Sequence, residues 1–412
     1  MRVLNKKIII ILEAVSEYYF NSLYMISSLN EIGVDYEIWV YCNEKEKLSD
    51  SDKYRISDQN ILSINEVETR LCREEECIVI TSVCCGVSRS NIALFKLLSK
   101  LKIRYGAFCH VPYVELNIRN GEKDYVGAVH YGLSPKNILY DLLRIRDING
   151  LVRLICNIKG QLPFLFGIRN MDFIIVSGTK SEELYLHFPC GANTKRIWAH
   201  CNDTEIYIKD DTELSENICT FIDTNLFWAI DASEEIKEYM MDTAEIYGKE
   251  ICAFFDSVER ITGLDVEIAC HPRLDRTQID FLRRIYGWRR VKKGETLQMI
   301  KQSKYVFVTM SSAIKYSVLS HKKTFVLSTS SLKKEKNVNS AIRQMAKLLE
   351  TDVIDVDRIR IDDKDSYDNE LRSLFLRQKD CGEFEKRYCR VNPNDNRVFW
   401  DIVINELNSL VI

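Results

Sequence analysis

Residues 7–12, KIIIIL, decide the fold that the sequence predicts. Four consecutive isoleucines and a leucine form a run without a polar position, which is typical of a strand covered on both faces. An amphipathic stretch at 16–32 follows, then Gly33, and then a second apolar run at 36–41. This order predicts a strand, a helix and a second strand parallel to the first.

The same alternation continues along the chain. Strands are expected at 77–82, 103–109 and 173–177, with helices at 91–101 and 180–188. After a polar segment at 199–211 the pattern restarts, with strands expected at 218–223, 266–270, 305–309, 324–327 and 353–356 and a long helix at 234–261. Strands that alternate with helices predict parallel sheets with helices on both faces.

A chain of 412 residues is long enough for two or three domains, each with its own core. We expect a first lobe at 1–205, with an insert at about 113–170, and a second lobe at 216–412. The linker is expected near 200–216. The C-terminal helices could pack back on the first lobe.

The composition excludes several classes of protein. Acidic residues number 60 and basic residues 57, so the formal net charge is -3, and a nucleic-acid partner is not expected because phosphate contacts need clustered Lys and Arg. No segment reaches the roughly 18 apolar residues that span a membrane. The short apolar run at 8–12 is followed by Glu13, which favours a core strand over a signal peptide.

The 14 cysteines are scattered and never form a CxxC pair. A disulfide framework or a zinc site needs tighter spacing. The pattern therefore predicts buried thiols in a reducing cytoplasm.

A histidine, a proline and a cation stand where one predicted strand ends. The sequence 265–273, DVEIACHPR, runs from a buried strand straight into His271, Pro272 and Arg273. Ligands of open parallel sheets bind at the carboxyl ends of the strands. The proline would fix the turn, and the imidazole and guanidinium would face an anionic ligand.

Two more polar turns are expected at the same edge, after the strands at 218–223 and 305–309. Their residues are Asp223, Thr224 and Asn225 in the first turn, and Thr309, Met310, Ser311 and Ser312 in the second. The second turn leads into a helix, whose free N–H groups and dipole favour an anion. The three turns together predict a rim that binds the phosphate of a nucleotide leaving group.

Each turn also has a simpler interpretation. A His-Pro pair is commonly only a turn, and a Ser-Ser pair before a helix is commonly only its N-cap. The combination favours a site, because three such turns follow successive strands of one sheet.

The second half of the chain resembles the donor-binding half of GT-B glycosyltransferases with a His-Pro motif and a downstream Ser-Ser motif. Bacterial sialyltransferases, polysialyltransferases and capsule Kdo transferases are such enzymes. The resemblance covers about residues 218–328 and rests on ICTFID at 218–223, IACHPR at 268–273 and VFVTMSS at 306–312. It implies an α/β fold of GT-B type, with two Rossmann-like lobes whose parallel sheets face a central cleft.

The resemblance also implies roles for individual residues. In that family the His and the Ser pair contact the phosphate and ribose of a CMP-sugar, so His271, Ser311 and Ser312 would do so here, without a metal or another cofactor. Arg273 is added because of its charge. The tripeptide Asp355-Val356-Asp357 matches the DxD metal site of a different glycosyltransferase fold, but it ends a short, late strand and is interpreted as a chance match.

The general base is missing from its expected place, because the first lobe lacks the Asp/Glu-Asp-Gly motif of the sialyltransferase relatives. The candidates are the loop carboxylates Glu13, Glu17, Glu115, Glu122 and Asp124. Glu122 and Asp124 are preferred, because a glycine-containing loop beyond a strand end can reach a cleft. A solvated, charged loop is the alternative.

Residues 136–169 mix Arg and Lys with Leu, Ile and Phe. A basic amphipathic helix is typical of a membrane-surface element, which would place the chain on the inner face of the plasma membrane near a lipid-linked acceptor. The alternative is an ordinary helical insert packed on the first lobe.

These features predict a glycosyltransferase that moves a sugar from a nucleotide-activated donor to a glycan or lipid-linked acceptor in bacterial surface polysaccharide synthesis. The expected donor is a CMP-sugar that carries a sialic acid or a Kdo-type sugar. Two alternatives stay open. One is another enzyme of GT-B fold, a UDP-sugar 2-epimerase or a polyol-phosphate transferase, and the other is a non-catalytic GT-B-like module in a polysaccharide assembly complex.

Overall fold

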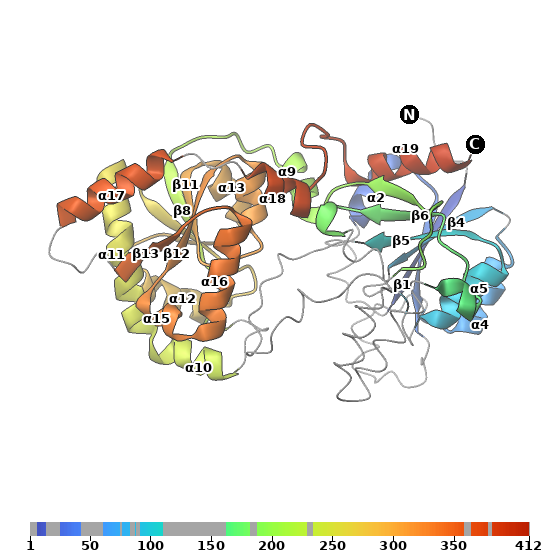
Figure 1. Cartoon of the computed structure of the whole chain (residues 1–412), viewed down its shortest axis with the longest axis horizontal. Coiled ribbons are helices and arrows are strands. Elements are labelled where there is room, and N and C mark those ends of the chain that lie inside the picture. The colour runs from blue at the N-terminus through green and yellow to red at the C-terminus, as the bar shows by residue number, and fades with distance from the viewer. Residues whose placement is uncertain are drawn as a thin grey trace. The chain divides into compact units, whose positions relative to one another are not determined.

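The computed structural model describes the chain in several stretches. They are residues 6–13, 25–42, 61–74, 76–82, 87, 91–109, 162–181, 188–228, 234–357, 364–377 and 381–411. These residues form two compact units, each an α/β body (Figure 1). Unit 1 contains the described residues up to 205 and those from 386 onward, and unit 2 contains those from 206 to 385.

Unit 1 is built on a seven-stranded parallel sheet with the strand order β3-β2-β1-β4-β5-β6-β7. Its strands are β1 (Lys7–Glu13), β2 (Tyr36–Tyr41), β3 (Ile61–Leu62), β4 (Cys77–Ser82), β5 (Arg104–Cys109), β6 (Phe173–Val176) and β7 (Lys195–Trp198). Its helices are α2 (Ile26–Ile32), α4 (Ile64–Leu71), α5 (Ile92–Lys100) and α19 (Phe399–Val411), with α9 (Asn202–Lys209) at the boundary between the units. This strand order is the doubly wound topology of Rossmann folds.

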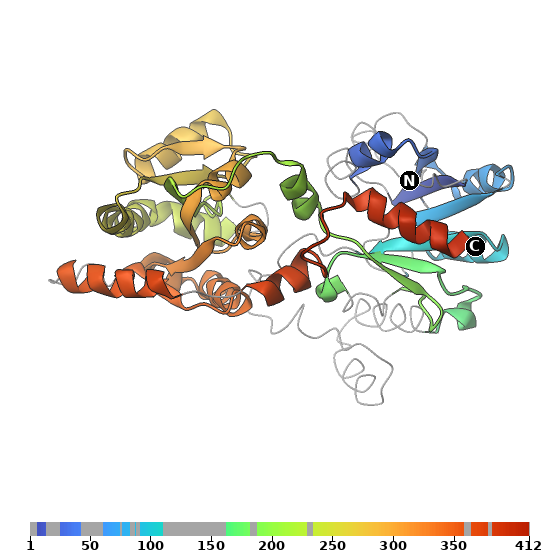
Figure 2. The same ribbon diagram turned by 90° about the horizontal axis from the view of Figure 1, so that it is seen from above.

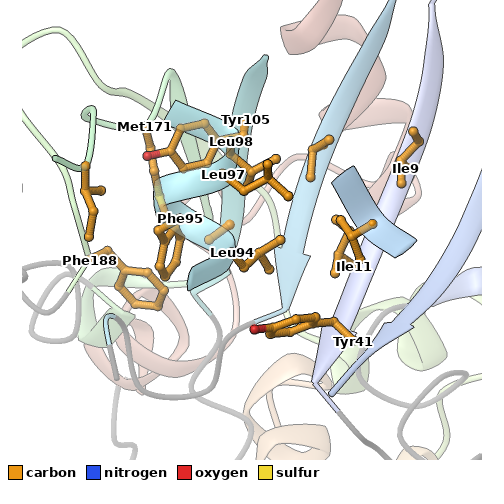
Figure 3. Close-up of a cluster of buried hydrophobic side chains, with 14 of the residues drawn as sticks. Ile9, Ile11, Tyr41, Leu94, Phe95, Leu97, Leu98, Tyr105, Met171 and Phe188 are labelled. Carbon is orange, nitrogen blue, oxygen red and sulfur yellow. The ribbon is translucent and has the colours of Figure 1, made fainter. Parts of the chain in front are cut away.

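Strand β1 is buried on both faces, as its run of isoleucines predicts. Ile8 and Ile10 belong to one core cluster, which contains residues of α2 and α19. Ile9 and Ile11 belong to the opposite cluster, which contains residues of α4 and α5 and is drawn in Figure 3. Because successive side chains of a strand point to opposite faces, one apolar run supplies both cores.

The C-terminal helix α19 is part of unit 1, although it follows unit 2 in the sequence (Figures 1 and 2). Trp400 is fully buried, and its indole N–H donates to the carbonyl of Met25 at 3.1 Å. Near the other end of the helix, the guanidinium of Arg104 donates to the carbonyl of Leu410 at 2.6 Å. A cation at this end also interacts favourably with the helix dipole. Both ends of α19 are thus attached to unit 1.

A buried carboxylate joins three segments of unit 1 that are far apart in the sequence. Glu205, on α9, accepts hydrogen bonds from the Ser28 hydroxyl at 2.5 Å and from the Phe399 backbone N–H at 2.8 Å. The imidazole of His200 lies 3.5 Å from the same carboxylate. The prediction of a polar linker near 200–216 missed α9. The polar residues of this segment suggested exposure to solvent, whereas the Glu205 side chain is buried and accepts hydrogen bonds within unit 1.

Unit 2 is built on a six-stranded parallel sheet with the order β10-β9-β8-β11-β12-β13. Its strands are β8 (Ile218–Ile222), β9 (Val266–Cys270), β10 (Val291–Lys293), β11 (Ser303–Val308), β12 (Lys323–Ser328) and β13 (Val353–Asp355). Its helices are α10 (Glu234–Asp242), α11 (Ala244–Thr262), α12 (Arg276–Ile285), α13 (Thr296–Lys301), α14 (Ile314–Leu319), α15 (Ser330–Lys334), α16 (Lys336–Leu348) and α17 (Lys364–Leu376), with α18 (Gly382–Tyr388) at the boundary.

The predicted fold class is confirmed, since both units are Rossmann-like and carry parallel sheets. All five strands predicted for the second half are present, as β8, β9, β11, β12 and β13. Strand β10 was not predicted, because only one residue of its sequence VKK is apolar. The helix predicted at 234–261 is two helices, α10 and α11, which are separated at Thr243.

Only the end of the segment 136–169 lies within the described residues. Residues Pro163–Phe166 form a short 3₁₀ turn, on which Phe164 and Leu165 are exposed. The rest of the segment lies outside the described residues, so its contact with a membrane stays a prediction. None of the described helices is both long and apolar enough to cross a membrane.

Candidate functional site

The carboxyl edge of the unit 2 sheet has a topological switch point between β8 and β11. Strands β9 and β10 extend the sheet on one side of this point, and β12 and β13 extend it on the other. Ligands of doubly wound sheets bind in the crevice outside such a point, because the connections leave it in opposite directions. The turns after β8 and β11 are two of the three polar turns that the sequence singled out.

A pair of hydroxyl groups connects these two turns. The Thr224 and Thr309 hydroxyl oxygens lie 2.5 Å apart in a hydrogen bond. Thr309 is fully buried, whereas Thr224 is partly exposed. The pair holds two hydrogens and uses one of them internally, so the other can be donated to a ligand.

His271 follows β9, the strand next to β8. It is half-buried, and its Nδ1 accepts a hydrogen bond from the backbone N–H of Arg273 at 3.2 Å. Burial lowers the pKa of His271, and the charge of Arg273 lowers it further. At neutral pH the imidazole is therefore mainly uncharged, and because Nδ1 accepts, the proton is on Nε2. The ring can thus donate one hydrogen bond to an anionic oxygen.

The serine pair lies in the turn between β11 and α14. The Ser311 hydroxyl accepts from the Ala313 N–H at 3.3 Å. Helix α14 begins at Ile314 with Ala313 as its N-cap, which makes no side-chain capping bond. Ser311 thus caps a backbone N–H of the turn that opens into the helix, as the simpler interpretation predicts, while Ser312 makes no capping bond. Both side chains are partly exposed and can donate to a ligand.

Asp223 is buried at the end of β8. Its Oδ1 accepts a hydrogen bond from the Tyr286 hydroxyl at 2.9 Å. Burial raises the pKa of this carboxyl to about 6, against the opposing effects of the Tyr286 hydroxyl and the Asn225 backbone N–H. No local sequence pattern points to Tyr286, which lies 63 residues away and immediately after α12. A raised pKa in a carboxyl at a strand end is typical of functional sites.

Replacing Asp223 with asparagine should stabilise unit 2 at high pH. The folded pKa is above the ordinary value of about 3.9, so the folded protein binds the proton more tightly and loses stability as the pH rises from about 4 to 6. The loss amounts to at most about 3 kcal/mol, and the neutral amide avoids it. Urea unfolding at pH 4 and pH 8 should show equal stabilities at pH 4 and a more stable variant at pH 8. The exposed Asp242→Asn is the control, and an equal gain there, or none at Asp223, would contradict this assignment.

The DxD tripeptide is part of an internal ion-pair network. The ammonium of Lys333 lies 2.5 Å from an Asp355 carboxylate oxygen and 2.8 Å from one of Asp357. Asp357 also accepts from the Ser330 backbone N–H at 2.6 Å. The two carboxylates thus fix α15, which fits the interpretation of the tripeptide as a chance match. Within the described stretches, no group of three or more His, Cys, Asp or Glu side chains could hold a metal ion.

The predicted general bases are not tested. Glu17, Glu115, Glu122 and Asp124 lie outside the described residues, and Glu13 is the last residue of β1, without a described side chain. Pro272 and Arg273 are exposed beside His271, where the sequence placed them. Eight of the ten selected positions lie at the carboxyl edge of the unit 2 sheet, namely 223–224, 271–273, 309 and 311–312.

No protein-family model matches this chain, and no curated protein matches it. Solved structures similar to it include the UDP-GlcNAc 2-epimerase from Methanocaldococcus jannaschii, with 12% identity, 98% of this chain and 99% of that chain covered, and a TM-score of 0.46. The wall teichoic acid polymerase TagF has 12% identity, 100% and 91% coverage, and a TM-score of 0.46. A further UDP-N-acetylglucosamine 2-epimerase has 12% identity, 100% and 97% coverage, and a TM-score of 0.42. At these TM-scores the fold assignment rests on the strand orders themselves.

Proposed function

We propose that unit 2 binds a nucleotide-activated sugar at the switch point between β8 and β11, and that the chain is a glycosyltransferase. The observation that carries this proposal is the meeting of polar strand ends at one edge. Thr224 and Thr309 are hydrogen-bonded across the switch point, and His271 follows the neighbouring strand as a neutral donor. Doubly wound sheets bind nucleotides at such a point.

In this proposal the donors of the edge bind the phosphate of the leaving nucleotide. The Nε2–H of His271 and the hydroxyls of Ser311 and Ser312 would contact phosphate oxygens as negative charge develops on them. Arg273 would add a positive charge. No metal cofactor is part of this scheme.

The acceptor side of the reaction belongs to the proposal as well. A carboxylate of Glu122 or Asp124 would deprotonate the acceptor hydroxyl, which belongs to a glycan or a lipid-linked glycan. The His-Pro and Ser-Ser motifs favour a CMP-sugar as donor, by their resemblance to the sialyltransferase and Kdo transferase families. Synthesis of a bacterial surface polysaccharide on the inner face of the membrane would use such an enzyme.

Nucleotide binding is the first property to test. CMP should raise the melting temperature of the purified chain more than CDP, UDP or GDP, because the proposed donor is a CMP-sugar. A ligand at 100 times its Kd stabilises the folded state by about 2.7 kcal/mol, which is large enough to measure. Thr309→Val should lose most of this rise, because the valine removes the hydroxyl pair at the switch point.

The matched control is Thr220→Val. Thr220 lies in β8 and is buried, as Thr309 is, and its hydroxyl pairs with the Ser303 hydroxyl at 2.6 Å. Unlike Thr309, Thr220 lies within its strand and not at the carboxyl edge of the sheet. This variant should melt lower and keep the full response to CMP. A rise in melting temperature with UDP alone would show that the nucleotide bound is UDP and not CMP. Conversion of a UDP-sugar without an acceptor would identify an epimerase. No response to any nucleotide would contradict the proposal and favour a non-catalytic module.

A further inference from the structure

Two buried oxygen atoms in the turn after β8 have no hydrogen-bond partner. They are Asp223 Oδ2 and Asn225 Oδ1, in side chains that are 5% and 8% exposed. Buried polar atoms are nearly always paired, so two unpaired ones within three residues need an explanation. A ligand that donates hydrogen bonds to this turn would pair both atoms.

Two other buried carboxylates among the described residues differ from Asp223. Both oxygens of Glu205 are hydrogen-bonded, to Ser28 and to the Phe399 N–H. Both oxygens of Asp368 are bonded by Arg260, each at 2.7 Å. Both of these carboxylates are fully paired. The Oε2 of buried Glu267 also lacks a hydrogen bond, but the ammonium of Lys292 lies 2.9 Å from it. Asp223 is hydrogen-bonded at Oδ1 and has no hydrogen bond at Oδ2.

The backbone of the same turn is also unusual. Asn225 has φ = 58°, in the left-handed region that few residues other than glycine adopt. Such conformations persist where the surrounding structure enforces them, and they concentrate at binding sites. The left-handed residue and the two unpaired oxygens therefore coincide at the switch point, where a doubly wound sheet binds its ligand.

The chemistry of the two atoms defines the group that they would bind. A carboxylate oxygen and an amide oxygen only accept hydrogen bonds, so their partner must donate. A phosphate would be repelled by the carboxylate, but two neighbouring hydroxyl groups provide two donors. We propose that Asp223 and Asn225 bind the two ribose hydroxyls of the nucleotide, while the donors at His271, Ser311 and Ser312 bind its phosphate. This inference rests on the proposed function, and it assigns the ribose to the side of the switch point that carries the acceptors.

The test compares ribonucleotides with nucleotides that lack a single hydroxyl. Calorimetry at pH 7.5 would measure the affinities of CMP, 2′-deoxy-CMP and 3′-deoxy-CMP, with the UDP and GDP series in parallel. The wild-type chain should bind the parent nucleotide at least about tenfold more tightly than either deoxy form, because hydrogen bonds to charged groups are the stronger ones. In Asp223→Asn this preference should fall to about threefold or less.

Asn225→Gly tests the second acceptor without straining the backbone, because glycine adopts the left-handed conformation freely. It should also weaken the preference for the parent nucleotide. His321→Gly is the matched control, because His321 has φ = 51° in the same unit but lies outside the turn. This control should retain the wild-type preference.

Proton release provides a second readout that a merely structural carboxylate would not show. A hydroxyl that donates to Asp223 favours its ionised form, so binding near pH 6 should release a proton from the wild-type chain. The binding heat should then vary with the ionisation enthalpy of the buffer, and it should not vary in Asp223→Asn.

The outcomes separate this inference from the proposed function. If nucleotides bind to the wild-type chain but the deoxy forms bind equally well and no proton is released, the assignment of the ribose is wrong and the proposed function stands. The same holds if Asp223→Asn and Asn225→Gly both keep the full preference. If no nucleotide binds at all, both proposals are wrong.

Discussion

Replacing His271 with alanine should lower the rate of sugar transfer about 10²–10³-fold. Loss of one positioned donor to a developing negative charge has a cost of this size. The Nε2–H of His271 is such a donor, because the Arg273 N–H occupies Nδ1 and leaves the proton on the other nitrogen. The fall should be mainly in kcat, since the phosphate charge grows as the bond to the sugar breaks. Steady-state kinetics with the donor identified by nucleotide binding would measure it.

The variants around His271 distinguish donation from a structural role. His271→Gln should recover part of the rate, because its amide N–H reaches the position of Nε2. His321→Asn is the control, because His321 is exposed in the same unit. A His271→Ala chain with wild-type turnover would exclude the role proposed for this residue.

The pH dependence of His271 has a defined sign. Its folded pKa lies below the ordinary value of about 6.5, so the neutral ring is the form that the folded state prefers. The stability that this residue contributes is present above pH 6.5 and is lost as the pH falls through the folded pKa. Protonation would also remove the acceptor for the Arg273 N–H. The contribution of His271 to the stability of unit 2 should therefore be complete at neutral pH and decrease on acidification, which urea unfolding at the two pH values would measure.

The sequence predicted the sheets well where burial is complete. The run at 8–12 and the strands β8, β9 and β11 are mainly apolar and almost completely buried, which is the usual pattern of a central parallel strand. The polar turns could be placed at one edge for the same reason, since parallel strands all end at that edge. Strand β10 is short and has two lysines among its three residues, so its position depends on pairing with β9 and not on its own sequence.

The environment of the candidate site could not be predicted. Asp223 looks like any acidic residue after a strand, and its raised pKa comes from burial beside Tyr286, which no local pattern connects with it. Glu205 appeared to be part of a solvated linker for the same reason. Its partners Ser28 and Phe399 are 177 and 194 residues away. Contacts of this kind follow from the tertiary fold, which a periodic pattern does not contain.

Replacing Trp400 with alanine should destabilise unit 1 by about 3–5 kcal/mol, the usual cost of removing a large, fully buried aromatic side chain. The variant loses the contacts of Trp400 in the core cluster shared by β1, α2 and α19, and it leaves the Met25 carbonyl without its indole partner. Urea unfolding followed by circular dichroism would measure the loss. Trp288→Ala is the control, because that tryptophan is 69% exposed and should change stability little.

The Trp400 variant also separates the two units experimentally. Because α19 packs in unit 1, the loss should affect the unfolding of unit 1 and leave the response of unit 2 to nucleotide unchanged at low temperature. Equal destabilisation by Trp288→Ala, or an unchanged stability of Trp400→Ala, would contradict the packing of α19 described here. Loss of nucleotide binding in a Trp400→Ala chain that is still folded would instead show that the C-terminal segment contributes to the site. We expect nucleotide binding to be unchanged in Trp400→Ala, because the polar turns that define the site all follow strands of the unit 2 sheet.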